Sequence, residues 1–130
     1  MACIMLVEDD PSIVALLHSM FQKEGYEILE AKDGQAALEK LGLGSAPAVS
    51  LMPDVIILDI MMPVMDGYTF ATRLQGSPVT NSIPLVVLTA KGPEVRDLFA
   101  MLPTMSAFVD KPFNPKDLRT LVAGIISRKT

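Results

Sequence analysis

The sequence alternates between short apolar runs and longer segments in which apolar residues recur at helical spacing. This alternation predicts strands that are each followed by a helix. Such units build a parallel sheet, because each helix returns the chain by a right-handed crossover. We therefore predict an α/β fold with strands at 3–7, 26–31, 55–58, 85–88 and 107–109, and with helices from Pro11, at 35–41, 66–74 and 93–102, and from Asn114-Pro115.

The strands differ in polarity. Segments 3–7, 55–58 and 85–88 are almost continuously apolar, which predicts central strands covered on both faces. Segment 26–31 is more polar and suits an edge. The segment 42–53 is rich in Gly, Ser, Ala and Pro, which indicates an elongated surface loop.

Helix boundaries also carry local signals. Asp10 can cap the first helix, with Pro11 at its first position, and Gly25 ends the segment. Pro103 would remove a hydrogen bond from a continuous helix, so the fourth helix should be short or distorted. The predicted apolar faces are Ile13, Leu16, Leu17, Met20 and Phe21 in the first helix, and Leu118, Leu121, Val122, Ile125 and Ile126 in the last.

Length and composition limit the functional classes. The 130 residues, half of them hydrophobic, predict one domain (1–130) without an effector domain, since the first strand begins near Met1 and the last helix ends near Thr130. A net charge of −4 argues against direct nucleic-acid binding. No stretch approaches the roughly 20 apolar residues of a membrane span, and Cys3 has no partner within the chain, so we expect a cytoplasmic protein.

Polar residues follow the apolar strands at one predicted edge of the sheet. Glu8 and Asp9 follow the first strand, Asp59 the third, Thr89 the fourth and Lys111 the fifth. Functional groups of open parallel sheets gather at the carboxyl ends of the strands. Three carboxylates in one crevice predict a hard divalent cation, for which Mg²⁺ is the natural candidate.

Lys111 and Thr89 suit the oxygens of a phosphoryl group, one as a point charge and the other as a hydroxyl donor. Asp59 could then be the nucleophile, forming an aspartyl phosphate whose charge is stabilised by the metal and by Lys111. The pattern therefore predicts a phosphoryl site.

The motifs LVEDDP, LDIMMPVMDG, VVLTA and DKPF, in this order over essentially the whole chain, resemble those of response regulator receiver domains of two-component signalling. The resemblance implies a flavodoxin-like doubly wound (βα)5 fold with strand order 2-1-3-4-5. It also implies that a histidine kinase or a phosphotransfer protein supplies the phosphoryl group, and that the surface then changes for a downstream protein. A weak homodimer through the fourth helix, fifth strand and fifth helix is a further expectation.

The same resemblance assigns roles residue by residue. Asp59 would be the phosphoacceptor, and Glu8 and Asp9 the acidic pair. Mg²⁺ would be held by Asp9, Asp59 and the backbone carbonyl of Met61, with Glu8 in the acidic pair beside them. Thr89 and Lys111 would complete the site. Phe108 would be the switch aromatic that packs inward when Thr89 moves toward the phosphoryl group, and the Lys111-Pro112 bond would be cis.

Alternatives remain open at this stage. The chain could be a degenerate receiver that binds a partner regardless of phosphorylation, as the unusual segment 102–105 suggests. A turnover enzyme such as an aspartyl phosphatase is less consistent, because no second acid stands two residues after Asp59. Phe108 could be a fixed core aromatic, and Phe99, Met101 and Leu102 could be core or an exposed contact patch.

Overall fold

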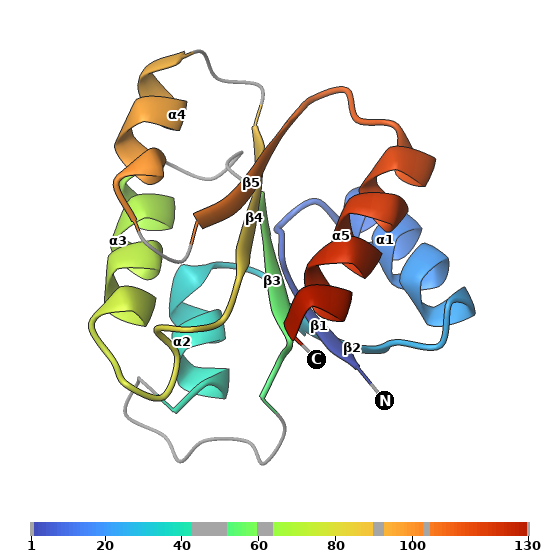
Figure 1. Cartoon of the computed structure of the whole chain (residues 1–130), viewed down its shortest axis with the longest axis horizontal. Helices are drawn as coiled ribbons and strands as arrows, with labels where there is room; N and C mark the ends of the chain where they lie inside the picture. Colours follow the sequence, from blue (N-terminus) through green and yellow to red (C-terminus); the bar gives the residue numbers. More distant parts are fainter. Residues whose placement is uncertain (1, 43–51, 60–63, 90–92, 103–104, 130) are drawn as a thin grey trace.

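The computed structural model describes residues 2–42, 52–59, 64–89, 93–102 and 105–129. Five parallel strands form one sheet in the order β2-β1-β3-β4-β5, and helices alternate with them along the chain (Figure 1). The predicted fold class and strand order are thus confirmed. The elements are β1 Cys3–Val7, α1 Pro11–Lys23, β2 Glu27–Ala31, α2 Gly34–Lys40, β3 Val55–Asp59, α3 Val64–Gln75, β4 Leu85–Thr89, α4 Pro93–Ala100, β5 Met105–Asp110 and α5 Pro115–Lys129.

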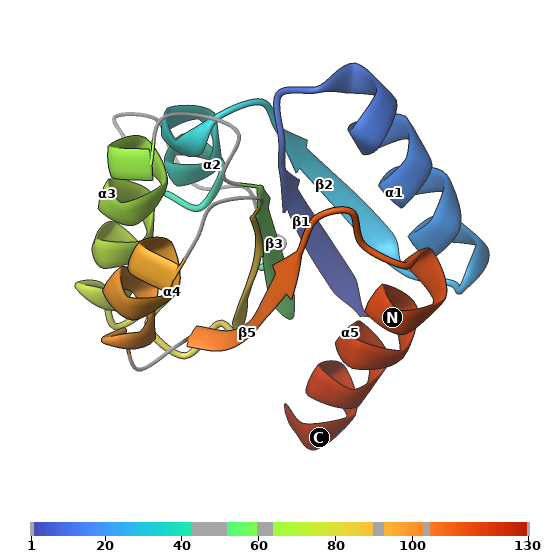
Figure 2. The same ribbon diagram turned by 90° about the horizontal axis from the view of Figure 1, so that it is seen from above.

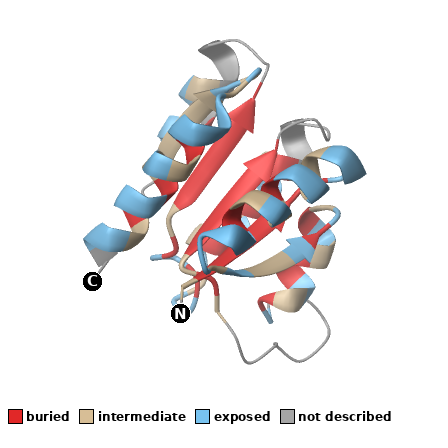
Figure 3. Cartoon of the chain, turned by 90° about the vertical axis from the view of Figure 1, so that its right-hand side faces the viewer, coloured by how far each residue is buried: buried red, intermediate tan, exposed pale blue. Residues whose placement is uncertain are grey.

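The molecule has three layers. Helices α1 and α5 cover one face of the sheet, and α2, α3 and α4 cover the other (Figure 2). One hydrophobic core lies on each face of the sheet, and successive residues of β1 point alternately into the two. Ile4 and Leu6 pack with α1 and α5, whereas Met5 and Val7 pack with the other three helices. The central strands are buried along their length, as expected for a sheet covered on both faces, while β2 at the edge is partly exposed (Figure 3).

Helix α1 begins and ends as its sequence predicts. The Asp10 side chain caps it by accepting a 2.9 Å hydrogen bond from the backbone N–H of Ser12. Its C-terminal end turns at Gly25, which has φ +93°, a left-handed conformation that glycine adopts without strain.

The predicted apolar face of α1 is wrong at Leu16, whose exposed fraction is 48%. Leu17 and Phe21 are buried and lie at the centre of the contact stripe. Because successive helical residues are about 100° apart, Leu16 lies about 120° from that centre. An i+3 spacing from Ile13 was therefore not enough to bring Leu16 into the core.

Helix α4 is short, as we predicted from the position of Pro103. It ends at Ala100, and the backbone N–H of Leu102 donates a 3.0 Å hydrogen bond to the Phe99 carbonyl. Phe99 and Leu102 are buried, while Met101 has an exposed fraction of 79%. Two of the three residues whose role was left open therefore belong to the core.

Other boundaries shift slightly. Helix α3 starts at Val64 rather than at 66, and β5 extends from Met105 to Asp110 rather than from 107 to 109. The longer β5 pairs with β4 through a register irregularity between Leu85 and Val86. Most of the predicted loop 42–53, namely 43–51, lies outside the described residues. Within the described ranges, no helix is both long and apolar enough to cross a membrane.

Candidate functional site

The predicted polar residues meet at the carboxyl ends of the strands. Glu8 directly follows β1, Asp59 ends β3, Thr89 ends β4, and Lys111 directly follows β5. Thr89 is opposite Asp110 in the β4–β5 register, and the backbone N–H of Lys111 donates a 2.9 Å hydrogen bond to the Thr89 carbonyl. The parallel sheet thus places these residues on one rim, because all five strands run in the same direction.

Asp59 and Lys111 form an ion pair at the centre of the rim. Lys111 Nζ lies 2.5 Å from Asp59 Oδ1 and also contacts Oδ2. The exposed fractions of the two side chains are 2% for Asp59 and 13% for Lys111. A buried carboxylate needs such a partner, because removal from water would otherwise make its charge unfavourable. The ion pair therefore explains how a carboxylate can lie at the end of a buried strand.

Glu8 is buried beside this pair. Its Oε1 accepts a 2.9 Å hydrogen bond from the backbone N–H of Asp10, while Oε2 has no hydrogen-bond partner among the described residues. Burial, and secondly the adjacent Asp59 side chain, raise the pKa of Glu8 to about 8. Among the described residues, the rim therefore has one buried carboxyl oxygen without a hydrogen-bond partner, and a cation bound beside it would favour the ionised form of Glu8.

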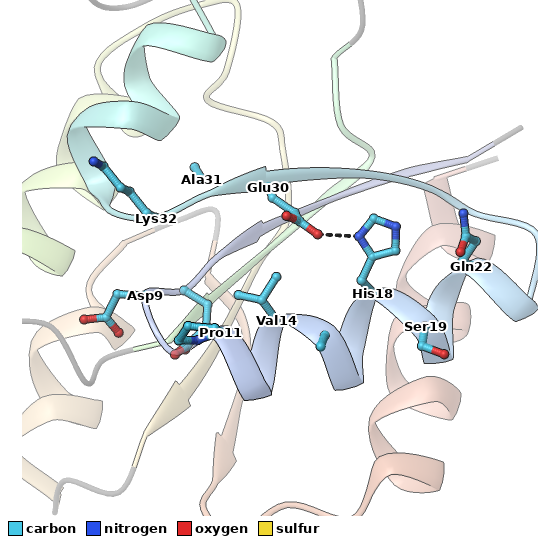
Figure 4. A pocket seen from close by; sticks show the side chains of 11 residues that line it. Asp9, Pro11, Val14, His18, Ser19, Gln22, Glu30, Ala31 and Lys32 are labelled. Carbon is cyan, nitrogen blue, oxygen red and sulfur yellow. Dashed lines mark hydrogen bonds and ion pairs between the residues drawn. The ribbon is translucent and has the colours of Figure 1, made fainter.

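Asp9 and Asp10 are both exposed, and they differ in what surrounds them. Hydrogen bonds from Ser12 lower the pKa of Asp10, which agrees with its predicted role as a helix cap. Asp9 is instead one of the residues that line a groove of about 680 Å³ between α1 and the end of β2 (Figure 4). His18 and Glu30 pair across this groove, and both side chains are partly exposed.

The metal ligands are only partly described. Within the described residues, no group of three or more His, Cys, Asp or Glu side chains stands close enough to hold a metal ion. The Met61 carbonyl lies outside the described residues. Glu8 Oε2 lies beside Asp59 and has no hydrogen-bond partner in the described ranges, which nevertheless fits a hard cation, since both residues supply oxygen atoms. The ligand set of Glu8, Asp9, Asp59 and Met61 stays a prediction.

Phe108 lies half-buried on the face of β5 that meets α4. Its ring makes an edge contact with Phe99, with ring centroids 6.5 Å apart and an interplanar angle of 90°. The Arg96 guanidinium lies over the same ring, 5.3 Å from its centroid, and forms a 2.5 Å ion pair with Asp110. Arg96 was not predicted from the sequence, because no local pattern relates a helix residue to a strand more than ten residues away. The Lys111-Pro112 bond is cis.

Comparison with known proteins agrees with this architecture. The family model for the response regulator receiver domain matches residues 4–123. The chain therefore belongs to the response regulator receiver family, and it is the receiver domain of a two-component response regulator.

Among curated relatives, the chain is 32% identical over 125 residues to the alkaline phosphatase synthesis transcriptional regulatory protein PhoP of Bacillus subtilis, covering 96% of this chain and 48% of that protein. It is 37% identical over 116 residues to the response regulator PleD of Caulobacter vibrioides, covering 87% of this chain and 23% of that protein. The chain thus spans about half the length, or less, of these curated relatives.

Among solved structures, the chemotaxis response regulator CheY4 of Vibrio cholerae superposes with a TM-score of 0.81 at 30% identity, covering 96% of this chain and 98% of that chain. The signal receiver domain of a histidine kinase from Syntrophus aciditrophicus superposes with a TM-score of 0.83 at 29% identity, covering 98% and 91%. Both likenesses extend over nearly the whole chain.

Proposed function

We propose that this domain accepts a phosphoryl group on Asp59 from a histidine kinase or a phosphotransfer protein and then changes its surface for a downstream protein. The observation that carries the proposal is the contact of Lys111 Nζ with both carboxylate oxygens of the buried Asp59, beside Glu8. This arrangement holds a nucleophile and a cationic group together at the end of a strand, where the family places its site.

In the proposed reaction, an Asp59 carboxylate oxygen forms a bond to phosphorus while the phosphorus–nitrogen bond of a phosphohistidine breaks. The leaving imidazole takes up a proton, so that the products are an aspartyl phosphate and a neutral histidine. Lys111 then neutralises a phosphoryl oxygen in place of one Asp59 oxygen, and the Thr89 hydroxyl donates to another. No other turnover is proposed, and the domain would act in signalling rather than as an enzyme with a separate substrate.

Mg²⁺ is the proposed cofactor, held by Asp9, Asp59 and the Met61 carbonyl with Glu8 nearby. When bound, it would offset the negative charge of the transferring phosphoryl group. Glu8 Oε2, which has no hydrogen-bond partner within the part of the chain that the structure describes, supports this assignment, because a cation beside it would favour the ionised carboxylate.

The proposed partners are proteins, and the proposed compartment is the cytoplasm. The net charge of −4 supports a domain that does not itself contact nucleic acid. Several relatives are nonetheless named as transcriptional regulators, and this domain covers only about half of their length. Direct DNA contact would therefore be a property of some other part of such a protein.

The test is the intact mass after incubation with Mg²⁺ and a small phosphodonor such as acetyl phosphate. We expect one added phosphoryl group on the parent and none on Asp59→Asn, which keeps the size of the side chain. Addition to both proteins would assign the acceptor to another residue. No addition to the parent under conditions in which Mg²⁺ binds would refute the proposed transfer.

A second candidate is a scaffold that binds its partner regardless of phosphorylation. The short α4 and the exposed Met101 at its end favour it, because they alter a surface near β5. Equal partner affinity for the phosphorylated parent and for Asp59→Asn would support the scaffold, whereas a difference would support the switch.

A further inference from the structure

Arg96 makes two contacts that join α4 to the end of β5. Its Nη2 lies 2.5 Å from Asp110 Oδ1, and its guanidinium carbon lies 5.3 Å from the centroid of the Phe108 ring. Phe108 and Asp110 are two residues apart on a strand, so their side chains leave the same face. Val109 between them packs on the opposite face, with α1 and α5. One side chain therefore holds two neighbours on the α4 side of β5.

The Phe108 ring is contacted twice by the same helix. Arg96 and Phe99 are three residues apart in α4 and thus share one side of it. Phe99 is fully buried and meets Phe108 edge-on, and its own ring meets Tyr68 of α3 at 5.7 Å and 88°. The ring of Phe108 is consequently held between a fixed aromatic and a partly exposed guanidinium.

The end of β5, which Arg96 contacts, is directly followed by Lys111 of the candidate site. Asp110 is the register partner of Thr89, and the next residue, Lys111, donates its backbone N–H to the Thr89 carbonyl and its ammonium to Asp59. A displacement of β5 relative to α4 would therefore also move the lysine that touches the proposed phosphoacceptor.

We propose that Arg96 is a positioning residue that holds Phe108 and the end of β5 against α4, which keeps Lys111 and Thr89 placed for phosphoryl acceptance. The link to phosphoryl acceptance rests on the proposed function, whereas the effect on Phe108 does not. The planar guanidinium suits this task, because it can pair with a carboxylate and lie over a ring at the same time.

The first arm of the test uses the unphosphorylated protein. With all five phenylalanines replaced by 4-fluorophenylalanine, the ¹⁹F resonance of Phe108 is assigned from its loss in Phe108→Leu. We expect Arg96→Gln to shift and broaden this resonance, because the ring loses the group that lies over it. The matched control is Arg119→Gln, because Arg119 is as exposed as Arg96 and forms an ion pair that joins α5 to Glu24, the residue after α1.

Two further variants separate charge from shape. Asp110→Asn should give a smaller change of the same kind, since the guanidinium loses its anchor but keeps its ring contact. Arg96→Lys keeps the charge and loses the planar group, so it should resemble Arg96→Gln more than the parent. A Phe108 resonance unchanged in folded Arg96→Gln and Arg96→Lys would overturn the proposal.

The second arm measures the initial rate of Asp59 phosphorylation by a small phosphodonor with Mg²⁺. We expect Arg96→Gln to lower the rate about threefold to tenfold, the factor that an exposed ion pair and a cation–π contact together represent. Arg119→Gln should match the parent. An unchanged rate in Arg96→Gln, despite a shifted Phe108 resonance, would overturn the link to the rim. A parent that accepts no phosphoryl group would instead refute the proposed function, and the ¹⁹F arm would still judge the effect of Arg96 on Phe108.

Discussion

Glu8 should make the stability of the metal-free protein fall as pH rises. Burial and the Asp59 side chain raise the folded-state pKa of Glu8 to about 8, from an ordinary value of 4.5 that applies to the unfolded chain. Between these two values the folded state binds more protons than the unfolded state at this residue, so the free energy of unfolding decreases with increasing pH. The stabilisation of the folded state by protonated Glu8 is complete below about pH 4.5 and is lost as pH rises through about 8.

The magnitude follows from the two pKa values. Each pKa unit corresponds to about 1.4 kcal/mol, so the interval from 4.5 to about 8 represents at most about 5 kcal/mol. Lys111 opposes part of this effect, because its positive charge favours ionised Glu8. Even half of this value would be a large share of the 5–15 kcal/mol typical of the whole free energy of unfolding.

The assay is urea denaturation across this pH range in the presence of a chelator, with Glu8→Gln as the test variant. Glutamine has the size of the protonated acid and does not titrate, so the variant should lack the Glu8 contribution. We therefore expect the stability of the parent relative to Glu8→Gln to decrease from pH 5 to pH 8. Glu39→Gln, at an exposed position of α2, controls for the loss of an acid elsewhere. A difference between parent and Glu8→Gln that stays constant with pH would refute the reasoning.

Three other predictions concern stability and reactivity. Lys111→Met leaves the Asp59 carboxylate buried without its partner, so we expect a loss of about 3 kcal/mol in urea denaturation; a loss no larger than that of the exposed Lys23→Met would contradict it. Burial, with Asp54 and Glu27, raises the pKa of the Cys3 thiol to about 11, so a thiol reagent at neutral pH should label it only after unfolding; rapid labelling of the folded protein would be inconsistent with this. Asp10→Ala should lower stability by about 1 kcal/mol through loss of the α1 cap, and an unchanged urea midpoint would argue against that role.

Features that depend on residues close in sequence were predictable. The alternation of apolar runs and helical spacing determines the order of the elements, and the direction of parallel strands then brings Glu8, Asp59, Thr89 and Lys111 to one rim. The Asp10 cap follows in the same way, because it acts within a few residues along the chain. The cap of α2 is equally local but was not predicted. There Asp33 accepts a 2.8 Å hydrogen bond from the backbone N–H of Ala36.

Features that depend on how the layers meet could not be predicted. Leu16 has the spacing of a core residue and is exposed, because the packing of α1 on the sheet selects a stripe centred on Leu17 and Phe21. Phe99 and Leu102 are buried while Met101 between them is not, and only the orientation of α4 decides between them.

The sequence by itself therefore determined the parallel α/β sheet and the set of polar residues at its rim, since period, chain direction and local caps are properties of short segments. Only the tertiary structure decided the burial and raised pKa of Glu8, the ion pair between Lys111 and Asp59, and the contacts of Arg96 with Phe108 and Asp110. These features arise from side chains on different elements, and their distances depend on how the helices and strands pack against one another.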